Sequence, residues 1–396
     1  MSVELTSHER ILKTIKGEKV DRVPVVPFDT FEALKLKEGS CDLMFATGEH
    51  LNDFTNGWKR TCAGYGEAVQ FAVENGCDVI HRTSFLELDR RFLLIPGEFI
   101  SVQDRRISNE ILQREYTVKT PRGNLTYIEE FKKDISTSWI RKSLLRDKSD
   151  VEKILSVPYR FRKSNVETFF KTGDELGDRG VICCFVSTPI VCVSHLFDFN
   201  TFLLWVHTEK KVIEGLIDTV YERIYCQLEY LLNSGVGPLI EFGGSEQATP
   251  PMMSPELYDD FVVKYDSRLV DLVHRYGRYA RVHCHGKVKT AIHKLLKMGA
   301  DMLNPVEAPP NGDIEIHEAK KIVKGKMTLE GNIQFSDLEF AEEEQINILV
   351  KNAVCDGGKD RFILTATEWP LTYLSGRLKK NYIQFIKSGI EYGKLN

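Results

Sequence analysis

The chain has 396 residues, a formal net charge of −4 and 42% hydrophobic residues. This length suffices for one large domain or two ordinary ones, and the composition is typical of a globular protein. The small negative charge excludes the broad basic field that attracts nucleic acid or anionic lipid. No apolar stretch approaches the roughly 18 residues that a membrane span needs. We therefore predict neither a nucleic-acid partner nor a membrane partner.

The cysteines and the N-terminus both favour a cytoplasmic protein. The nine cysteines are scattered, odd in number and without a Cys-x-x-Cys pair. A secreted disulfide framework would normally show an even number at regular spacing. The first five residues lack the basic and then apolar pattern of a secretory signal. We expect the protein to work in a reducing cytoplasm.

Short apolar runs, separated by helical patterns, dominate the chain. The first 20 residues predict an amphipathic helix that opens at Ser7 and forms an N-terminal extension. Eight runs then predict β-strands, at residues 22–28, 78–85, 181–187, 238–242, 279–285, 301–306, 327–330 and 361–365. Most of these runs are continuously apolar, as is typical of strands that are buried on both faces.

Repeated strand-then-helix units indicate a parallel sheet, and eight units favour a closed barrel. We therefore predict an α/β fold, a (β/α)8 TIM barrel that forms a single domain over residues 1–396. Residues 97–133 depart from this pattern and predict a β-meander inserted after the second strand, with a turn at residues 120–123. We interpret this insertion as a candidate lid.

The pair His283 and His285 stands where the fifth predicted strand runs into Gly286. Because side chains alternate along a strand, we expect both imidazoles to point the same way and Cys284 to point away from them. Two imidazoles on one face suit metal ligation, or a general base with a partner. The alternative is one buried, hydrogen-bonded histidine with an unimportant neighbour, and the His-x-His spacing favours the functional interpretation.

Other polar residues follow the remaining strands. In a TIM barrel the active site gathers at the C-terminal ends of the strands. The residues at or just after these ends are Glu241 and Glu246 for the fourth strand, Glu307 for the sixth, Asn332 for the seventh and Glu368 for the eighth. Carboxylates and imidazoles on neighbouring strand ends can build a metal site or an acid/base pair.

Several segments, spread over nearly the whole chain, are similar to one known family. They are Glu9-Arg10 with Asp21-Arg22-Val23-Pro24-Val25, the helix start Ser254-Pro255-Glu256, Gly312-Asp313-Ile314, and Leu329-Glu330-Gly331-Asn332. In this order they resemble the uroporphyrinogen decarboxylase superfamily. That superfamily contains the haem-pathway decarboxylase and the cobalamin-dependent methyltransferases that share its barrel, so the resemblance implies the same fold.

Residues 27–33 indicate which branch is closer. The decarboxylase has an Arg-Gln-Ala-Gly-Arg-Tyr stretch after its first strand, whose arginines bind the carboxylates of the substrate. This chain has no arginine there and instead carries Asp29 and Glu32. These acids would repel a porphyrinogen with many carboxylates. The resemblance is therefore closer to the methyltransferase branch.

The methyltransferase branch holds zinc with a His-x-Cys-Gly motif at the fifth strand and a cysteine after the eighth. Here His285 stands in the place of the first cysteine, and Glu368 is the nearest candidate after strand eight. The resemblance thus implies His283, His285 and Glu368 as zinc ligands. Such a set is harder than one with thiolates, so methyl transfer in general is better supported than transfer to a thiol.

The resemblance implies a methyltransferase of one-carbon metabolism. It would move a methyl group between a small methylated donor or acceptor and the cobalt of a corrinoid (cobalamin) that a separate partner protein carries. We expect Glu246 and Glu241 to act as catalytic acid or base, and Asn332 and Glu307 to bind the substrate. One alternative is a metal-dependent lyase or hydrolase that acts on a small acid without corrinoid. Another is a catalytically silent barrel that binds a partner protein.

Overall fold

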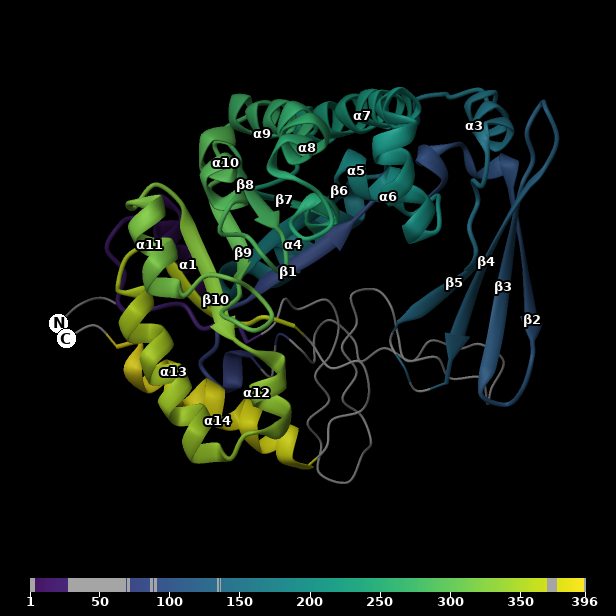
Figure 1. Cartoon of the computed structure of the whole chain (residues 1–396). Helices are drawn as coiled ribbons and strands as arrows, with labels where there is room; N and C mark the ends of the chain where they lie inside the picture. Colours follow the sequence, from purple (N-terminus) through teal and green to yellow (C-terminus); the bar gives the residue numbers. More distant parts are fainter. Residues whose placement is uncertain are drawn as a thin grey trace.

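A curved sheet of seven parallel strands forms the centre of the fold (Figure 1). The computed structural model describes residues 4–27, 72–85, 91–133, 137–368 and 376–394, together with residues 69, 88 and 135. In spatial order the strands are β1 (Ile80–Ser84), β6 (Val181–Ser187), β7 (Leu239–Gly243), β8 (Tyr279–His283), β9 (Met302–Val306), β10 (Thr328–Ile333) and β11 (Phe362–Ala366). Every residue of β7, β9 and β11 is buried, as expected of strands covered on both faces.

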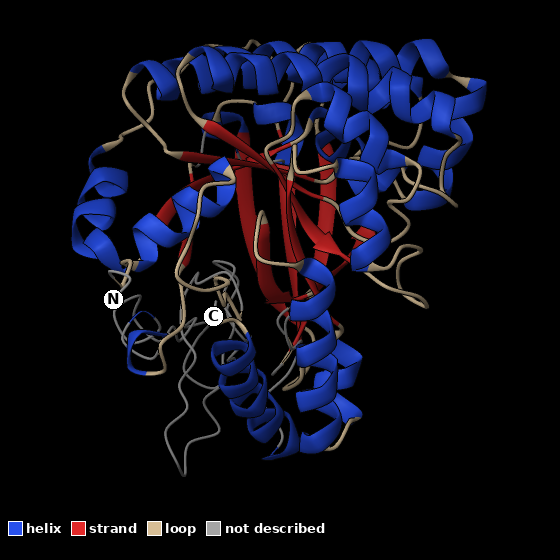
Figure 2. Ribbon diagram, turned by 90° about the vertical axis from the view of Figure 1, so that its left-hand side faces the viewer, coloured by secondary structure: helices blue, strands red, loops and turns tan. Residues whose placement is uncertain are grey.

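Helices surround this sheet (Figure 2). They are α3 (Lys148–Leu155), α4 (Glu167–Leu176), α5 (Pro189–Ser194), α6 (Phe199–Thr208), α7 (Lys210–Asn233), α8 (Pro255–Tyr258), α9 (Lys264–Arg275), α10 (Ala291–Met298), α11 (Ile316–Val323), α12 (Phe335–Phe340), α13 (Glu343–Gly357) and α14 (Gly376–Tyr392). None of the helices in the described part of the chain is both long and apolar enough to cross a membrane. The alternation of strands and helices confirms the predicted fold class, and seven predicted strands lie within three residues of the observed ends.

Helix α1 (Ser7–Lys16) closes the N-terminal end of the barrel. It begins with a capping box, in which Thr6 accepts the Glu9 N–H and the Glu9 carboxylate accepts the Thr6 N–H. Its residues Ile11 and Ile15 are fully buried. They belong to one apolar cluster with the first residues of several strands, namely Ile80, Val181, Leu239 and Met302. The predicted N-terminal extension is therefore an apolar plug, which fills the barrel at the N-terminal ends of its strands.

The first predicted strand, residues 22–28, was expected to be regular, and its described part is not. Val25 makes a single parallel bridge to Leu364 of β11. Leu364 donates to the Pro24 carbonyl, and Val26 donates back to the Leu364 carbonyl. Pro24 and Pro27 have no N–H to donate, so a longer ladder cannot form. The eighth strand position is thus filled by a short extended segment, and residue 28 lies outside the described residues.

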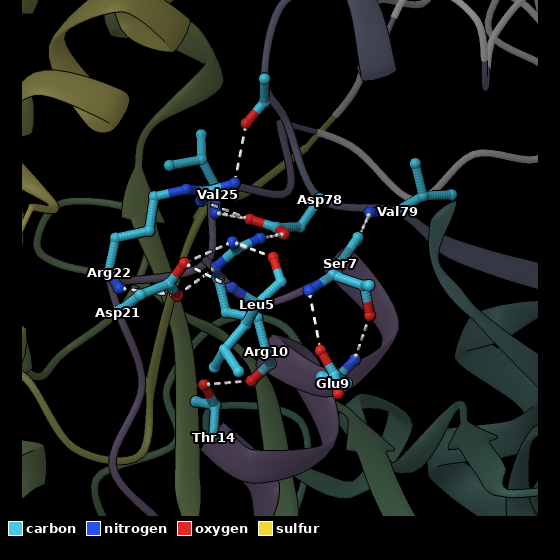
Figure 3. Close-up of polar contacts among 12 residues, drawn as sticks. Leu5, Ser7, Glu9, Arg10, Thr14, Asp21, Arg22, Val25, Asp78 and Val79 are labelled. Carbon is cyan, nitrogen blue, oxygen red and sulfur yellow. Dashed lines mark hydrogen bonds and ion pairs between the residues drawn. The ribbon is translucent and has the colours of Figure 1, made fainter. Parts of the chain in front are cut away.

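An ion-pair network holds this segment in place (Figure 3). Arg10 of α1 lies 2.7 Å from Asp21 and 2.7 Å from Asp78, which precedes β1. Arg22 lies 2.6 Å from the other Asp78 oxygen, and that carboxylate also accepts the Val25 N–H. The Asp78 N–H donates to the Val25 carbonyl. The segment therefore joins β11 to the residues that lead into β1.

The insertion between β1 and β6 is an antiparallel sheet that stands to one side of the barrel (Figure 1). Its strands are β2 (Ile100–Arg106), β3 (Ile111–Val118), β4 (Leu125–Lys132) and β5 (Ser138–Lys142). The predicted meander and its turn are confirmed, since Gly123 donates to the Thr120 carbonyl. Strand β2 runs over mostly exposed residues, because it pairs with β3 along its whole length. Strand β5 lies beyond the predicted boundary.

The network around Arg10 predicts a loss of stability in acid. Burial would raise the pKa of the Asp21 carboxyl, but hydrogen bonds from Arg10 and from the Leu5 N–H, with the Arg10 charge, lower that pKa to about 2. A carboxyl with a lowered pKa stabilises the fold above its unfolded pKa of about 4, and this contribution is lost as the pH falls toward 2. We expect Asp21→Asn to lower the free energy of unfolding by about 2 kcal/mol at pH 7.

The same substitution should have a smaller effect at pH 2.5, because the carboxyl of the unfolded chain is then largely protonated and must lose its proton when the chain folds. Urea unfolding at pH 7, 4 and 2.5 measures both effects. Asp178→Asn, which removes an exposed carboxylate, is the control. An equal loss of stability at all three pH values would contradict the prediction.

Candidate functional site

The C-terminal ends of neighbouring strands bring two imidazoles and three carboxylates together. His283 is the last residue of β8, and His285 follows it by two residues. Glu307 directly follows β9, and Glu368 lies two residues beyond β11. Glu246 lies in the 3-10 turn Ser245–Ala248 after β7, close enough for its charge to act on His285. The strand-end site therefore lies where a TIM barrel places its catalytic groups.

His285 lies between two carboxylates from different strands. Its Nδ1 is 3.4 Å from Glu307 Oε2, and its Nε2 is 3.8 Å from Glu368 Oε2. Glu307 also accepts the Gly286 N–H at 2.6 Å, which fixes this carboxylate beside the ring. The His283 and His285 ring centroids are 4.6 Å apart, with their planes at 85°. The two rings therefore lie together on one side of the strand end, as the alternation of the strand predicts.

The carboxylates determine the charge of His285. Burial alone would lower the pKa of this imidazole, but the hydrogen bond with Glu307 and the charges of Glu368, Glu307 and Glu246 raise the pKa above its ordinary value. Burial likewise opposes ionisation of Glu307, yet the contact with His285 and the Gly286 N–H lower the pKa of this carboxyl. The geometry thus favours an imidazolium–carboxylate pair.

His283 has the opposite environment. Burial, the neighbouring His285 and the charges of Arg82 and Arg281 lower its pKa well below the ordinary value, although a hydrogen bond to Asn304 opposes this. Its Nδ1 lies 2.7 Å from Asn304 Oδ1. Because the Asn304 amide nitrogen donates to Glu330, the amide oxygen must accept from His283. The network therefore assigns the proton to Nδ1 and leaves Nε2 with a free electron pair.

A buried ion-pair network lies beneath His283 in the barrel interior. Arg281 makes two hydrogen bonds of 2.7 Å to Glu330 on β10. It also bonds Glu241 on β7 at 2.5 Å, and Arg82 on β1 bonds the other Glu241 oxygen at 2.9 Å. Arg281, Glu241 and Glu330 are each fully buried. Two arginines and two glutamates thus balance one another across the barrel.

The predicted site residues fall into three groups. Five of them, His283, His285, Glu307, Glu368 and Glu246, are brought together at the strand ends. Glu241 lies deeper, bound to two arginines, so its expected role in catalysis stays a prediction and its contacts favour a positioning role. Asn332 lies near the end of β10, in register with Thr365, and makes no side-chain hydrogen bond to the described residues. Asp29 and Glu32 lie outside the described residues.

Sequence reasoning missed four residues that support the site: Arg82, Arg281, Asn304 and Glu330. Arg281 precedes His283 by two residues, so strand alternation places both on the barrel interior. For Arg281, Asn304 and Glu330 the available signal was a polar residue inside an otherwise apolar strand, whereas β1, which carries Arg82, is mostly polar. The identity of the partners could not be predicted, because Arg281 and Glu330 are 49 residues apart and meet only through the curvature of the sheet.

Cys284 is separated from this chemistry. Its side chain is fully buried, and it belongs to the main apolar cluster outside the barrel interior. Burial, with smaller contributions from nearby carboxyls, raises the pKa of the thiol far above its ordinary value. A thiolate is the form that ligates metals and attacks electrophiles, so Cys284 is an inert packing residue.

The donor set of the strand-end site does not meet the needs of zinc as its side chains are placed. Zinc binds neutral imidazole and takes at least three protein ligands in catalytic sites. Within the described residues, no three His, Cys, Asp or Glu side chains converge closely enough to hold a metal ion. Both nitrogens of His285 face carboxylates, and His283 offers Nε2 alone. As placed, these side chains fit an acid/base cluster better than a metal centre.

Three comparisons relate the chain to known proteins. The family model for uroporphyrinogen decarboxylase (URO-D) matches residues 130–366, more than half of the chain. A search of curated protein sequences found no match. Among solved structures, a methyltransferase from Methanosarcina mazei is similar with a TM-score of 0.61 and 16% identity, over 98% of this chain and 99% of that one.

A second similar structure is a B12-independent methionine synthase from Shewanella sp. W3-18-1 in complex with selenomethionine. It gives a TM-score of 0.51 and 13% identity, over 93% of this chain and 97% of that chain. Identities this low show a shared fold and leave the reaction open.

The ion-pair network predicts a strong effect of one substitution. Arg281→Met would leave Glu241 and Glu330 buried without their shared cation, so we expect the free energy of unfolding to fall by about 3–5 kcal/mol. Chemical denaturation followed by circular dichroism measures this change. Arg275→Met, at an exposed arginine on α9, should leave the stability nearly unchanged.

Adding Glu330→Gln to Arg281→Met should recover part of the loss, because it removes the unpaired carboxylate while Glu241 keeps its ion pair with Arg82. If the double variant is no more stable than Arg281→Met, lost packing rather than charge explains the effect.

Proposed function

The chain belongs to the uroporphyrinogen decarboxylase family, and from this premise we propose that it is a methyltransferase. It would move a methyl group between a small methylated compound and the cobalt of a corrinoid that a separate protein carries. The observation that supports this proposal is the position of His285, between Glu307 and Glu368 at the mouth of the barrel. A methyl group leaves an oxygen or sulfur atom more easily when that atom receives a proton. The carboxylates beside His285 favour the protonated form of its imidazole, which can donate this proton.

His285 would act as the general acid. As the bond between the methyl carbon and the heteroatom breaks, its electron pair stays on the heteroatom, which takes a proton from His285. The corrinoid of the partner would supply the electron pair that forms the new bond to the methyl carbon. Glu307 and Glu368 stabilise the protonated imidazole before transfer, and Glu246 adds a third negative charge nearby.

His283 would bind or orient the substrate. Its Nε2 keeps a free electron pair, and the link through Asn304 to Glu330 fixes the direction of the ring. A ring that is already oriented loses little entropy when it engages a ligand. In the reverse reaction, Nε2 can accept a proton from an acceptor such as an alcohol or thiol.

The charge of the site limits the substrate class. Three carboxylates face one imidazolium, so the described residues of the strand-end site carry a net negative charge. The two arginines below are already bound to Glu241 and Glu330. A polycarboxylate would meet repulsion there without a free cation in the described site residues to bind it. The proposed substrate is therefore a neutral methylated alcohol, ether or thioether.

Substitution of His285 tests this function. We expect His285→Gln to slow methyl transfer about 100-fold or more, because general acid catalysis commonly contributes 10²- to 10⁴-fold. The assay mixes the protein with a reduced corrinoid protein and methanol, a methyl ether or a methyl thioether, and follows the cobalt absorption spectrum. His293→Gln, at an exposed histidine on α10, should retain full activity.

The outcomes separate the proposal from its main alternative. No spectral change with any methyl compound would contradict methyl transfer. Turnover of a small carboxylic acid without corrinoid would instead support a lyase or hydrolase. Equal losses in the two histidine variants would contradict the assignment of His285 as the acid.

The zinc that the family resemblance implies stays a prediction, and no step above passes through it. Elemental analysis of the purified protein and of His283→Ala tests it separately. Stoichiometric zinc that is lost in the variant would add a Lewis acid to the mechanism, bound through His283 Nε2.

A further inference from the structure

A cavity of about 520 Å³ lies between the inserted sheet and helix α7. None of its lining residues belongs to the strand-end site. Its volume is within the range of small-molecule sites, which is roughly 300–1,000 Å³. Its wall carries the aromatic residues Phe92, Tyr116 and Tyr159, and the arginines Arg91, Arg114, Arg160 and Arg162.

A strained turn builds one wall of this cavity. In the turn Arg91–Leu94, residues Phe92, Leu93 and Leu94 have φ values of 52°, 56° and 57°. Bulky residues avoid this left-handed conformation, because the Cβ atom then lies too close to a backbone carbonyl. Arg223 of α7 holds the turn by donating to the buried Leu93 carbonyl at 2.6 Å. Strain that the surrounding structure maintains in this way is typical of ligand sites.

The aromatic wall is rigid. The Phe92 ring packs edge-on against Tyr116 and Tyr127, each with centroids 5.5 Å apart. Tyr159 also lines the cavity, and the Arg223 guanidinium lies over its ring at 4.6 Å. Phe92 and Tyr116 are almost completely buried and form a fixed base, while Tyr159 is partly exposed. A flat apolar ligand could stack here at little entropic cost.

The charge of the cavity is positive. No acidic residue lines it. Asp104 pairs with Arg114 and Glu98 pairs with Arg162, while Arg91 donates to the Tyr116 hydroxyl. Arg160 makes no hydrogen bond or ion pair to any residue that the structure describes, and it lies at the exposed rim. An anion that enters would find its guanidinium available.

We propose that this cavity is a second ligand site, which takes a small organic anion with a flat aromatic body and binds its acidic group with Arg160. The aromatic wall recognises the body, and the arginine fork suits a carboxylate. This preference is the opposite of that of the strand-end site, whose described residues carry a net negative charge. The proposal therefore goes beyond methyl transfer and does not depend on it.

Benzoate is the probe that tests this site, with benzyl alcohol as its neutral counterpart. Isothermal titration calorimetry of the full-length protein should show one benzoate bound per chain and weaker binding of benzyl alcohol. Arg160→Ala should weaken benzoate binding about tenfold, as expected for loss of a charge-assisted hydrogen bond. Lys163→Ala, at an exposed cation outside the lining, should leave binding unchanged.

A second variant distinguishes loss of binding from loss of folding. Val102 lines the cavity and is 54% exposed, so Val102→Glu should fold normally and should repel benzoate from the site. His285→Gln should bind benzoate as the wild type does, because the strand-end site is separate. Absence of binding to the wild type, or equal weakening by Arg160→Ala and Lys163→Ala, would overturn the proposal. So would loss of binding in His285→Gln.

Discussion

The Arg281 guanidinium, held between Glu241 and Glu330, is the interaction on which the interior of this barrel depends. Barrels of this kind usually fill the space between their strands with branched apolar side chains. Here the layer above the apolar plug of α1 is ionic, and its four charges come from β1, β7, β8 and β10. Buried charges are costly to take out of water and are tolerated only when each is matched. The matching of two arginines by two glutamates therefore fixes which residues of these strands face inward and at what height.

This ionic layer helps to explain why the pKa values of two histidines in one short segment are shifted in opposite directions. His283 is linked to the layer through Asn304 and lies near two arginines, which favours its neutral form. His285 has left the strand and meets the carboxylates that follow β9 and β11. Pairs of titratable groups whose surroundings move their pKa values apart are typical of acid/base catalysis. The layer thus stabilises the fold and also prepares the site for proton transfer.

Strand alternation and barrel geometry predicted most of the architecture and part of the site. The continuous apolar runs located seven strands, and the His-x-His spacing correctly placed both rings on one side. The first predicted strand, at residues 22–28, was overestimated because the rule for apolar runs takes no account of the donors that Pro24 and Pro27 lack. Glu241 was taken as terminal because the predicted strand ended one residue too early, whereas it lies in the middle of β7. Its partners come from distant parts of the chain, and no local pattern reveals them.

The way in which the barrel closes sets an order on its assembly during synthesis. The segment that fills the eighth position bonds Leu364 and Gly393, more than 300 residues later in the chain. Contacts of such long range form slowly, because the chain between the two segments must lose conformational entropy before the contacts can stabilise the fold. Until β11 has been made and has paired with this segment, the sheet therefore keeps open edges, with unpaired backbone groups of the kind that promote aggregation.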